Sequence, residues 1–454
     1  MVSFYKPKAK EFKIKSEVVK CESLDIQGRG VARTSQGMAF IQGLLPDESA
    51  KIEILGVSGQ SVKTRLLRIE EFSPARLKPL CADSLKCGGC PLMHVPSDME
   101  LSAKIEGIKR LFLKNSRITL GEPARVETGA NLGYRRICRL AIRNDRGHIS
   151  MGFREGGSHS LLDISECAIL TARINNLLEP LKKVFAELDS KDRLTQAEIL
   201  DSDCKVGLQL RFTRKVTAHD EEILNECARN LDLVVYLSEP CRIKKDLVSK
   251  PEDSVAERLL CGRREDLYIT SQGSRMYCRP SSFVQVNREI NEKIVSFVIE
   301  AIAPTQDDKI LDLFSGLGNF AFPLARTGAV VNAVDIVREM IDEANLNAKE
   351  QGLSNLKFHR VNLEEDFSRQ SWAREQSVKA VVDPGRQGAK NVAAYFDKTS
   401  VKKIAYVSCN PLAASRDIAS LIKSGYKIDS WGVFDMFPNT SHVETVVLMS
   451  RVRE

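Results

Sequence analysis

The chain has 454 residues, of which 43% are hydrophobic and 28% are charged, a composition typical of globular proteins rather than of disordered or collagen-like ones. At roughly 100–200 residues per domain, this length predicts about two to four domains. No stretch approaches the roughly 18 apolar residues of a membrane helix, and the first residues lack the apolar core of a secretory signal, so we expect a cytoplasmic protein. Twelve cysteines in that compartment predict buried thiols, metal ligands or catalytic groups rather than a disulfide framework.

The net charge of +7 is unevenly distributed along the chain. Residues 1–80 contain 14 Lys and Arg against 9 Asp and Glu. Five lysines alternate along one segment, at Lys6, Lys8, Lys10, Lys13 and Lys15. A local basic surplus fits a polyanion partner, and a solvated tail explains the charge equally well.

Residues 12–72 contain short runs of β-type residues separated by turns. The runs are Phe12–Lys20, Gly37–Ile41, Ser49–Leu55 and Thr64–Glu70, with Gly28-Arg29-Gly30, Gly43 and Pro46-Asp47 between them. Several short strands at this spacing predict a small β-barrel.

The remainder of the chain changes character twice. A helix is expected at about Met99–Lys114, from the apolar residues along one of its faces, and it can pack on the C-terminal part of the chain. Strands and helices mix up to about residue 279, and from about Ser282 helices alternate with apolar strands, which is typical of a parallel α/β sheet. We therefore expect an α/β protein with a barrel at 8–72, a mixed α+β region at 76–279 and a doubly wound, Rossmann-like domain at 280–454.

A candidate nucleotide site lies at the start of that last part. The apolar run Lys309–Phe314 leads into Ser315-Gly316-Leu317-Gly318-Asn319 and then into a helical segment, Phe320–Arg326. Glycines at such a turn let a ligand approach the helix N-terminus. The next strand, Val330–Val334, ends at Asp335, where an acid can accept hydrogen bonds from two ribose hydroxyls. This order predicts a nucleotide ligand but does not separate a dinucleotide from S-adenosylmethionine.

Two later strands add reactive groups. Lys379–Val382 leads into Asp383-Pro384-Gly385-Arg386, and Ile404–Val407 leads into Ser408-Cys409-Asn410-Pro411. Because the carboxyl ends of neighbouring strands open on one crevice in a doubly wound sheet, Asp383 and Cys409 should share a site with the cofactor. Cys409 is placed to attack a substrate if its thiolate is favoured, and a small apolar cap on the strand is its alternative role.

These segments resemble the motifs of RNA uracil-C5 methyltransferases over essentially the whole chain. The similar segments are Asp312–Asn319, Asp383–Arg386, Val407–Pro411, His442-Val443-Glu444-Thr445 and Phe283-Val284-Gln285-Val286-Asn287. The resemblance implies that S-adenosylmethionine donates the methyl group, that Cys409 attacks C6 of uracil and that Glu444 removes the C5 proton. It also implies a cofactor site formed by Gln285, Phe314, Asn319, Asp335, Asn362 and Asp383, with Asp383 facing the target base too. Gly385 departs from the proline that the family usually has there, which leaves the role of Asp383 unchanged.

A cysteine cluster follows the barrel. Cys81, Cys87 and Cys90 form a C-x5-C-x2-C pattern, and Cys167 is the candidate for a fourth ligand. Spacing alone allows either zinc or an iron–sulfur cluster. The family resemblance favours a [4Fe–4S] cluster, because ribosomal-RNA members carry one on this pattern, and it implies a structural or RNA-contacting role.

The RNA partner is also implied by the resemblance. Residues 12–72 resemble a TRAM domain, an RNA-binding barrel similar to an OB-fold. A second basic and aromatic set is expected in the central region, from Tyr134, Arg135, Arg136, Arg139, Phe153 and Arg154. Barrel and cluster together resemble the large-subunit ribosomal RNA enzyme of the family, and that resemblance implies action on uracil-1939 of 23S ribosomal RNA, in a looped or single-stranded segment with a flipped uridine. We expect the protein to be a monomer. The alternatives are a catalytically silent RNA-binding or ribosome-assembly factor, and a uracil-C5 enzyme for another ribosomal site or for tRNA.

Overall fold

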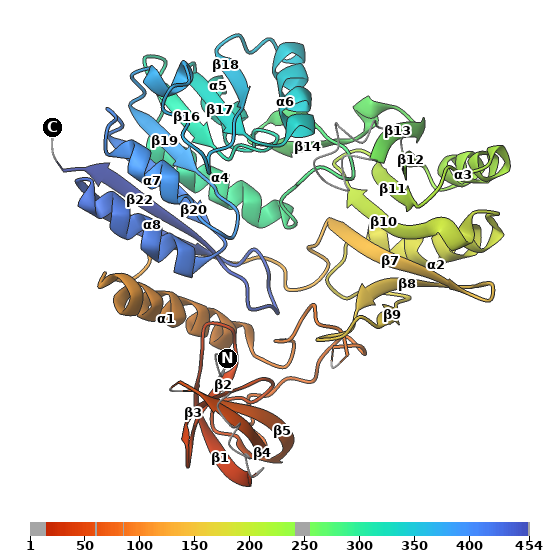
Figure 1. Cartoon of the computed structure of the whole chain (residues 1–454), viewed down its shortest axis with the longest axis vertical. Helices are drawn as coiled ribbons and strands as arrows, with labels where there is room; N and C mark the ends of the chain where they lie inside the picture. The colour runs from red at the N-terminus through yellow and green to blue at the C-terminus, as the bar shows by residue number, and fades with distance from the viewer. Residues whose placement is uncertain (1–14, 60, 85, 241–254, 453–454) are drawn as a thin grey trace, which may run out of the picture. The chain divides into compact units, whose positions relative to one another are not determined.

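The computed structural model describes residues 15–59, 61–84, 86–240 and 255–452 (Figure 1). Four of the five N-terminal lysines lie outside the described residues, as does Cys241. The chain forms two compact units. Unit 1 consists of residues 1–85, 89–108 and 439–441, and unit 2 of residues 86–88, 109–438 and 442–454. Among the described residues, no helix is long and apolar enough to cross a membrane.

Unit 1 contains the predicted barrel. Its strands are β1 (Lys15–Leu24), β2 (Gly30–Thr34), β3 (Gly37–Ile41), β4 (Ser49–Ser58) and β5 (Ser61–Glu71), and they close in the order β1-β2-β3-β5-β4. The sequence had suggested a turn at Gly30, which instead begins β2. A Cβ atom at Gly30 would lie 2.6 Å from the carbonyl oxygen of Leu44, so a glycine is needed there for close packing within the barrel.

A buried carboxylate lies in the connection between β3 and β4. Glu48 is fully buried and accepts hydrogen bonds from the Leu45 N–H at 2.8 Å and from Nε of Arg76 at 2.6 Å. Arg76 also donates to the carbonyl oxygen of Gly43 at 2.6 Å. Burial acts to raise the pKa of Glu48, but the hydrogen bonds from Arg76 and the backbone outweigh it and lower the pKa. Arg76 therefore supplies the charge that makes this burial tolerable.

The expected helix is present as α1 (Ser97–Ser116). It is followed by a seven-stranded sheet in the order β13-β12-β11-β10-β7-β8-β9. Its elements are β7 (Ile137–Asp145), β8 (His148–Arg154), β9 (Leu161–Asp163), α2 (Ala172–Glu187), β10 (Leu194–Asp201), β11 (Val206–Phe212), α3 (Ala218–Asn230), β12 (Leu233–Pro240) and β13 (Val255–Cys261). A hairpin of β14 (Tyr268–Ser271) and β15 (Ser274–Tyr277) then leads toward the last sheet. Short 3₁₀ turns lie at Lys191–Arg193, Arg264–Asp266 and Trp372–Arg374.

The last sheet has eight strands in the order β18-β17-β16-β19-β20-β22-β21-β6. Its strands are β16 (Lys309–Leu313), β17 (Val330–Asp335), β18 (Leu356–Arg360), β19 (Lys379–Val382), β20 (Lys403–Ser408), β21 (Tyr426–Phe434) and β22 (Glu444–Arg451), with β6 (Arg125–Glu127) from much earlier in the chain. The strands from β16 to β20 are parallel, and β22 runs antiparallel to β20. The predicted α/β sheet is thus confirmed, whereas the contribution of β6 was not foreseen.

Helices cover both faces of this sheet (Figure 1). The helices α4 (Arg288–Ile302), α5 (Ala321–Arg326) and α6 (Arg338–Glu350) share one hydrophobic core with Ala405 and Val407 of β20. Tyr406 lies between these two residues and so points to the opposite face, where its hydroxyl donates to Asp417 of α8 (Pro411–Lys423) at 2.7 Å. The neighbouring helix is α7 (Lys390–Phe396). This layering is the doubly wound arrangement.

We expect Arg76→Ala to destabilise the protein by about 3 kcal/mol, because it leaves the buried Glu48 carboxylate without its counter-charge. Arg68→Ala is the matched control, since Arg68 lies in the same barrel and forms an ion pair with Glu70 while its side chain is 66% exposed. Urea unfolding followed by circular dichroism measures both variants. Equal stability of the two would contradict the role assigned to Arg76.

Candidate active site

The turn between β16 and α5 has the backbone of a ligand-binding loop. Phe314, Gly316 and Gly318 have φ values of 65°, 54° and 97°. A Cβ atom at Gly318 would lie 2.7 Å from the ring of Phe322, so only glycine fits this close approach. Phe314 is a bulky residue held in the left-handed region, which costs roughly 1–3 kcal/mol. Such strain is typical of functional loops, and Phe314 is one of the predicted cofactor residues.

Asp335 holds this loop in place from the end of β17. One carboxylate oxygen accepts a hydrogen bond from the Gly316 N–H at 3.0 Å, and the other accepts from the Val337 N–H at 2.9 Å. Each oxygen keeps a further lone pair. Asp335 can therefore shape the loop and still accept hydrogen bonds from ribose hydroxyls.

The other predicted cofactor residues lie around the same loop. The amides of Asn319 and Asn291 form two reciprocal hydrogen bonds of 2.9 Å, which tie the loop to α4. Gln285 is half-buried in the segment that leads into α4. Asn362 follows β18, where its amide donates to Glu365 at 2.7 Å and accepts from the Glu364 N–H at 3.0 Å. In this structure the Asn362 side chain thus stabilises its own turn.

The carboxyl edge, meaning the edge of the sheet at which β16 to β20 end, brings the reactive groups together. Cys409 follows β20 directly, and Glu444 begins the neighbouring β22. Because Ser408 pairs with Thr445, the next pair across these antiparallel strands is Cys409 and Glu444. The Thr445 hydroxyl donates to the Ser408 carbonyl at 3.2 Å and reinforces this register. Sequence reasoning grouped these two residues only through a family resemblance, and the strand pairing gives the physical reason.

The acidic groups at this edge suppress one another's ionisation. Burial raises the pKa of Cys409 to about 12, and the charges of Glu444 and Asp383 contribute to that rise. Burial also raises the pKa of Asp383 to about 7. Burial and the charge of Asp383 together raise the pKa of Glu444 well above its usual range. Cys409 and Glu444 therefore favour their protonated forms, Asp383 exchanges its proton near neutral pH, and a cation brought to this edge would favour the thiolate.

Two charged residues of this region had no assigned role in the sequence analysis. Arg386 is the positive group that lowers the pKa of Cys409, and its backbone carbonyl accepts a hydrogen bond of 2.6 Å from the amide of Asn410. Asp312 is fully buried within β16, and burial together with Asp383 raises its pKa. The sequence carried a signal for each of these residues: Arg386 directly follows Asp-Pro-Gly, and Asp312 is a charged residue inside an apolar strand.

Asn410 connects the two catalytic segments. Its side chain accepts a hydrogen bond from the Leu412 N–H at 3.1 Å and so caps the N-terminus of α8. The same amide holds Arg386 through the bond described above. The Asn-Pro pair after Cys409 is therefore explained by a helix start that also fixes the neighbouring loop.

The four candidate cluster cysteines are divided between the two units. Cys81 and Cys90 belong to unit 1, whereas Cys87 and Cys167 belong to unit 2, where both pack against the core of the central sheet. Asn175 fixes Cys167 by accepting from its N–H at 2.8 Å and donating to its carbonyl at 3.0 Å. Within the described part of the chain, no group of three or more metal-ligating side chains is gathered. The four cysteines therefore fit a metal cluster only in part, because two of them, Cys87 and Cys167, pack against the same hydrophobic core.

The basic and aromatic set expected in the central region is only partly exposed. Tyr134 and Arg136 are buried, and Arg136 forms an ion pair with Asp203 at 2.6 Å. The prediction that these two residues form a surface for RNA is wrong, because the arginine serves as a buried counter-charge. Arg139 is exposed and pairs with Glu198 at 2.9 Å, and Arg154 is also exposed.

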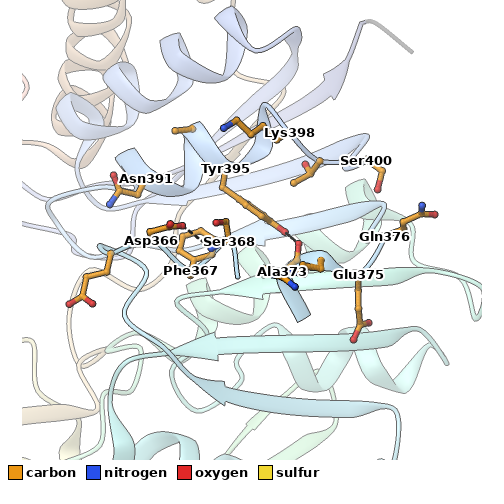
Figure 2. A pocket seen from close by; sticks show the side chains of 14 residues that line it. Asp366, Phe367, Ser368, Ala373, Glu375, Gln376, Asn391, Tyr395, Lys398 and Ser400 are labelled. Atoms are coloured by element: carbon orange, nitrogen blue, oxygen red, sulfur yellow. Dashed lines mark hydrogen bonds between the residues drawn. The ribbon is translucent and has the colours of Figure 1, made fainter. Parts of the chain in front are cut away.

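A hollow of about 830 Å³ lies elsewhere on the sheet domain. Figure 2 shows Tyr395 crossing it, with the hydroxyl donating to the carbonyl oxygen of Ala373 at 2.7 Å. None of the predicted site residues lines this hollow. The convergence of reactive groups at the carboxyl edge, rather than this hollow, therefore identifies the candidate active site.

Comparisons with known proteins show the family and the fold of the chain. Residues 100–452 match the family described as tRNA (uracil-5-)-methyltransferase. The chain is 34% identical over 455 residues to the 23S rRNA (uracil(1939)-C(5))-methyltransferase RlmD of Tolumonas auensis, covering 99% of this chain and 100% of that protein. It is 32% identical to the protein of the same name from Aliivibrio fischeri, with the same coverage. The crystal structure of a Pyrococcus abyssi tRNA (uracil-54, C5)-methyltransferase with S-adenosyl-L-homocysteine has the same fold, with a TM-score of 0.71, 24% identity and coverage of 95% of this chain and 99% of that one.

We expect Asp383→Asn to stabilise the protein at pH 8. The pKa of Asp383 rises from 3.8 to about 7 on folding, so the unfolded chain releases this proton more readily, and the aspartate destabilises the fold increasingly as the pH rises from about 4 to 7. The melting temperature of the variant should exceed that of the parent more at pH 8 than at pH 5. Asp307→Asn, at an exposed position, should change neither value, and a lower melting temperature of Asp383→Asn at pH 8 would refute the assignment.

Proposed function

The chain belongs to the tRNA (uracil-5-)-methyltransferase family and is an S-adenosylmethionine-dependent RNA (uracil-C5) methyltransferase, and from that premise we propose that it methylates C5 of a uridine in 23S ribosomal RNA. The proposed target is uracil-1939, because relatives that match the full length of the chain are named for that position. The observation that carries the mechanism is the opposition of Cys409 and Glu444 across β20 and β22, with Asp383 beside them.

Cys409 provides the nucleophile in this proposal. C5 of uracil is too weakly nucleophilic to accept a methyl group directly, and addition of a thiolate at C6 moves electron density to C5. Arg386 lowers the pKa of Cys409 and so favours the thiolate. A uridine must leave its stack for C6 to reach a partly buried thiol.

Glu444 completes the reaction as the general base. Once C5 carries both its hydrogen and the new methyl group, the carboxylate of Glu444 takes the C5 proton, the electron pair re-forms the C5–C6 double bond, and the C6–S bond breaks to release the Cys409 thiolate. A raised pKa suits this role, because it makes the carboxylate a stronger base.

The residues at the carboxyl edge fit S-adenosylmethionine, whose sulfonium supplies the methyl group when it is bound. The glycine at position 318 lets the loop turn pack tightly against the ring of Phe322, and Asp335 retains lone pairs for the ribose. Gln285, Phe314, Asn319, Asn362 and Asp383 complete the proposed set. Asp383, with a pKa of about 7, can donate a hydrogen bond in its protonated form to an oxygen of the target base.

The barrel supports an RNA substrate. The guanidinium of Arg29 lies 5.0 Å from the ring centre of Phe40, which is 37% exposed. Arg33 is a further exposed cation on the adjacent strand. Exposed aromatic rings beside arginines suit single-stranded or looped RNA, so we assign the barrel the TRAM role of holding the substrate.

The second candidate is a silent RNA-binding or ribosome-assembly factor on the same scaffold. The presence of both Cys409 and Glu444 disfavours it, because a silent factor has no need of two ionisable groups buried together. Another ribosomal site, or tRNA, remains the alternative substrate, since the matched family is named for tRNA. Mapping of 5-methyluridine in 23S RNA and tRNA from a strain that lacks the protein separates these substrates.

We predict a covalent adduct between Cys409 and 23S RNA transcribed with 5-fluorouridine in the presence of S-adenosylmethionine. Fluorine at C5 leaves no proton for Glu444 to remove, so the C6–S bond cannot break. The adduct is detected by denaturing gel electrophoresis, and Cys409→Ala should abolish it. Cys204→Ala, which changes an exposed cysteine, should form the adduct normally. Intact RNA binding without any adduct would favour the silent factor.

We also propose that Cys81, Cys87, Cys90 and Cys167 bind a [4Fe–4S] cluster. The support is the cysteine spacing together with the placement of Cys87 and Cys167 on one core. No catalytic step depends on it in this proposal. When bound, the cluster would join chain segments that are distant in sequence, which is a structural role.

Anaerobically purified protein should therefore contain iron and acid-labile sulfide in about equal amounts, as [4Fe–4S] stoichiometry requires. Cys167→Ser should lose much of both, because it removes one of the four ligands, while Cys204→Ser should keep them. Metal analysis and visible absorbance provide the measurement. Bound zinc, or a Cys167→Ser variant with unchanged iron, would refute the cluster.

A further inference from the structure

The turn that carries Arg386 is hydrogen-bonded to α8 and its N-cap residue at three points. It spans residues 384–389, between β19 and α7. Two of its carbonyl groups accept hydrogen bonds and one of its N–H groups donates. The bonds run from Asn410 Nδ2 to the Arg386 carbonyl at 2.6 Å, from Arg416 Nη2 to the Gln387 carbonyl at 2.8 Å, and from the Ala389 N–H to Asp417 Oδ2 at 2.6 Å. Because Asn410 directly follows Cys409, the start of this helix connects the nucleophile with the turn.

Asp417 is the central residue of this attachment. Its side chain is 1% exposed. Oδ2 also accepts a hydrogen bond from the Tyr406 hydroxyl at 2.7 Å, and Oδ1 accepts from Nε of Arg416 at 2.8 Å. A Cβ atom at Gly388 would clash with Oδ2, and the φ of this residue, 81°, is left-handed. The glycine therefore lets the turn approach the buried carboxylate closely.

The effect of Arg386 on the nucleophile depends on where this turn lies. Burial and the charges of Glu444 and Asp383 raise the pKa of Cys409, and the charge of Arg386 lowers it. The Arg386 side chain is exposed, so packing does not hold it, and its attraction for the thiolate weakens with distance. Asp383 is held independently of the turn, because its N–H donates to the carbonyl oxygen of Leu313 at 3.1 Å.

We propose that Asp417 is a positioning residue for Arg386, whose guanidinium it keeps near the Cys409 thiol by holding the Ala389 N–H at the end of the turn. The proposal rests on the proposed function of Cys409 as the nucleophile. A carboxylate is costly to bury and has to be matched by donors, and here one of the donors is the backbone of the turn itself. Loss of this acceptor would release the end of the turn and let Arg386 move away from the thiol.

A displaced Arg386 should impair the attack of Cys409 on C6 in a way that depends on pH. Each unit by which the pKa of the thiol rises lowers the thiolate fraction about tenfold at a pH below that pKa. The pH dependence of the attack therefore shifts to higher pH. A general loss of folding would instead lower the rate by the same factor at every pH, so the two explanations are distinguishable.

Two double variants isolate the hydrogen bond to Ala389. Both carry Tyr406→Phe, so that no buried hydroxyl loses its acceptor when the carboxylate is changed. Asp417→Asn in this background keeps a side-chain oxygen for the Ala389 N–H, whereas Asp417→Leu has a similar branched shape without any oxygen. Tyr406→Phe alone retains the carboxylate and its bond to the turn, and it serves as the control. Melting temperatures check that the variants fold.

The measurement is the rate at which the adduct with 5-fluorouridine 23S RNA forms, followed as a function of pH with S-adenosylmethionine present. For Tyr406→Phe with Asp417→Leu we expect a rate about tenfold lower at neutral pH and a pH dependence displaced upward by about one unit. Arg386→Ala is the reference and should show the same displacement. Tyr406→Phe, alone or with Asp417→Asn, should follow the pH dependence of the parent.

The decisive comparison adds Arg386→Ala to the Tyr406→Phe, Asp417→Leu variant. If Asp417 acts through Arg386, the two losses should not add, and the combined variant should be about as slow as Arg386→Ala alone. Losses that multiply would overturn the proposal, because Asp417 would then act independently of the arginine. Equal losses in both double variants, or a pH dependence that is not displaced in the Leu variant or in Arg386→Ala, would overturn it as well.

Gly388→Ala decides if the Leu variant does not fold. Its Cβ atom pushes the turn away from Asp417 without altering α8. We expect the same upward displacement of the pH dependence, and no further loss when Arg386→Ala is added. Adduct kinetics like those of the parent would overturn the proposal. Failure of the parent to form the 5-fluorouridine adduct would overturn the proposed function instead.

Discussion

The thiol of Cys409 and the carboxyl groups of Asp383 and Glu444 repel one another when they ionise, and all three lie at the carboxyl edge of one sheet. A fourth acid, Asp312, lies buried in β16 and shares in this repulsion. Such a cluster is costly in an empty site but suits a reaction that brings a cation to it. Arg386 is the nearby positive charge of the chain itself that acts on the thiol. The site thus sacrifices stability for reactivity, a common exchange in enzymes.

The parts of the chain around this edge act mainly as supports. Asp335 shapes the cofactor loop through Gly316, and Asn410 fixes Arg386. The central region contributes in the same way, since the buried pair of Arg136 and Asp203 is joined by Arg288 at the start of α4 at 3.3 Å. The segment that contains Gln285 therefore lies between Arg136, whose N–H donates to the carbonyl oxygen of Val286 at 2.9 Å, and the start of α4, which this ion pair holds. Rigid support of this kind is what positions reactive groups accurately.

Much of the fold followed from local patterns, because apolar strands and glycine turns depend on neighbours along the chain. Lys379–Val382 was predicted as a strand and occurs with those bounds, and the helix expected at Met99–Lys114 occurs as α1. Pairing between distant segments was not predictable in this way. β6 has only three residues, too few for a periodic signal, and the burial of Arg136 depends on Asp203, 67 positions away. For the site, the sequence indicated which residues bear chemistry, whereas the strand register explains why Cys409 faces Glu444.

The pairing of β6 with β21 also limits how the chain can be divided. The Rossmann-like part defined from the sequence begins near residue 280, yet its sheet takes its last strand from Arg125–Glu127. A fragment that starts at residue 280 would leave residues 432–434 of β21 without their strand partner, and an open strand edge of this kind is a template for aggregation. The catalytic sheet therefore cannot be excised as a contiguous piece of sequence, and any shortened or split version of the protein has to keep residues 125–127 in place.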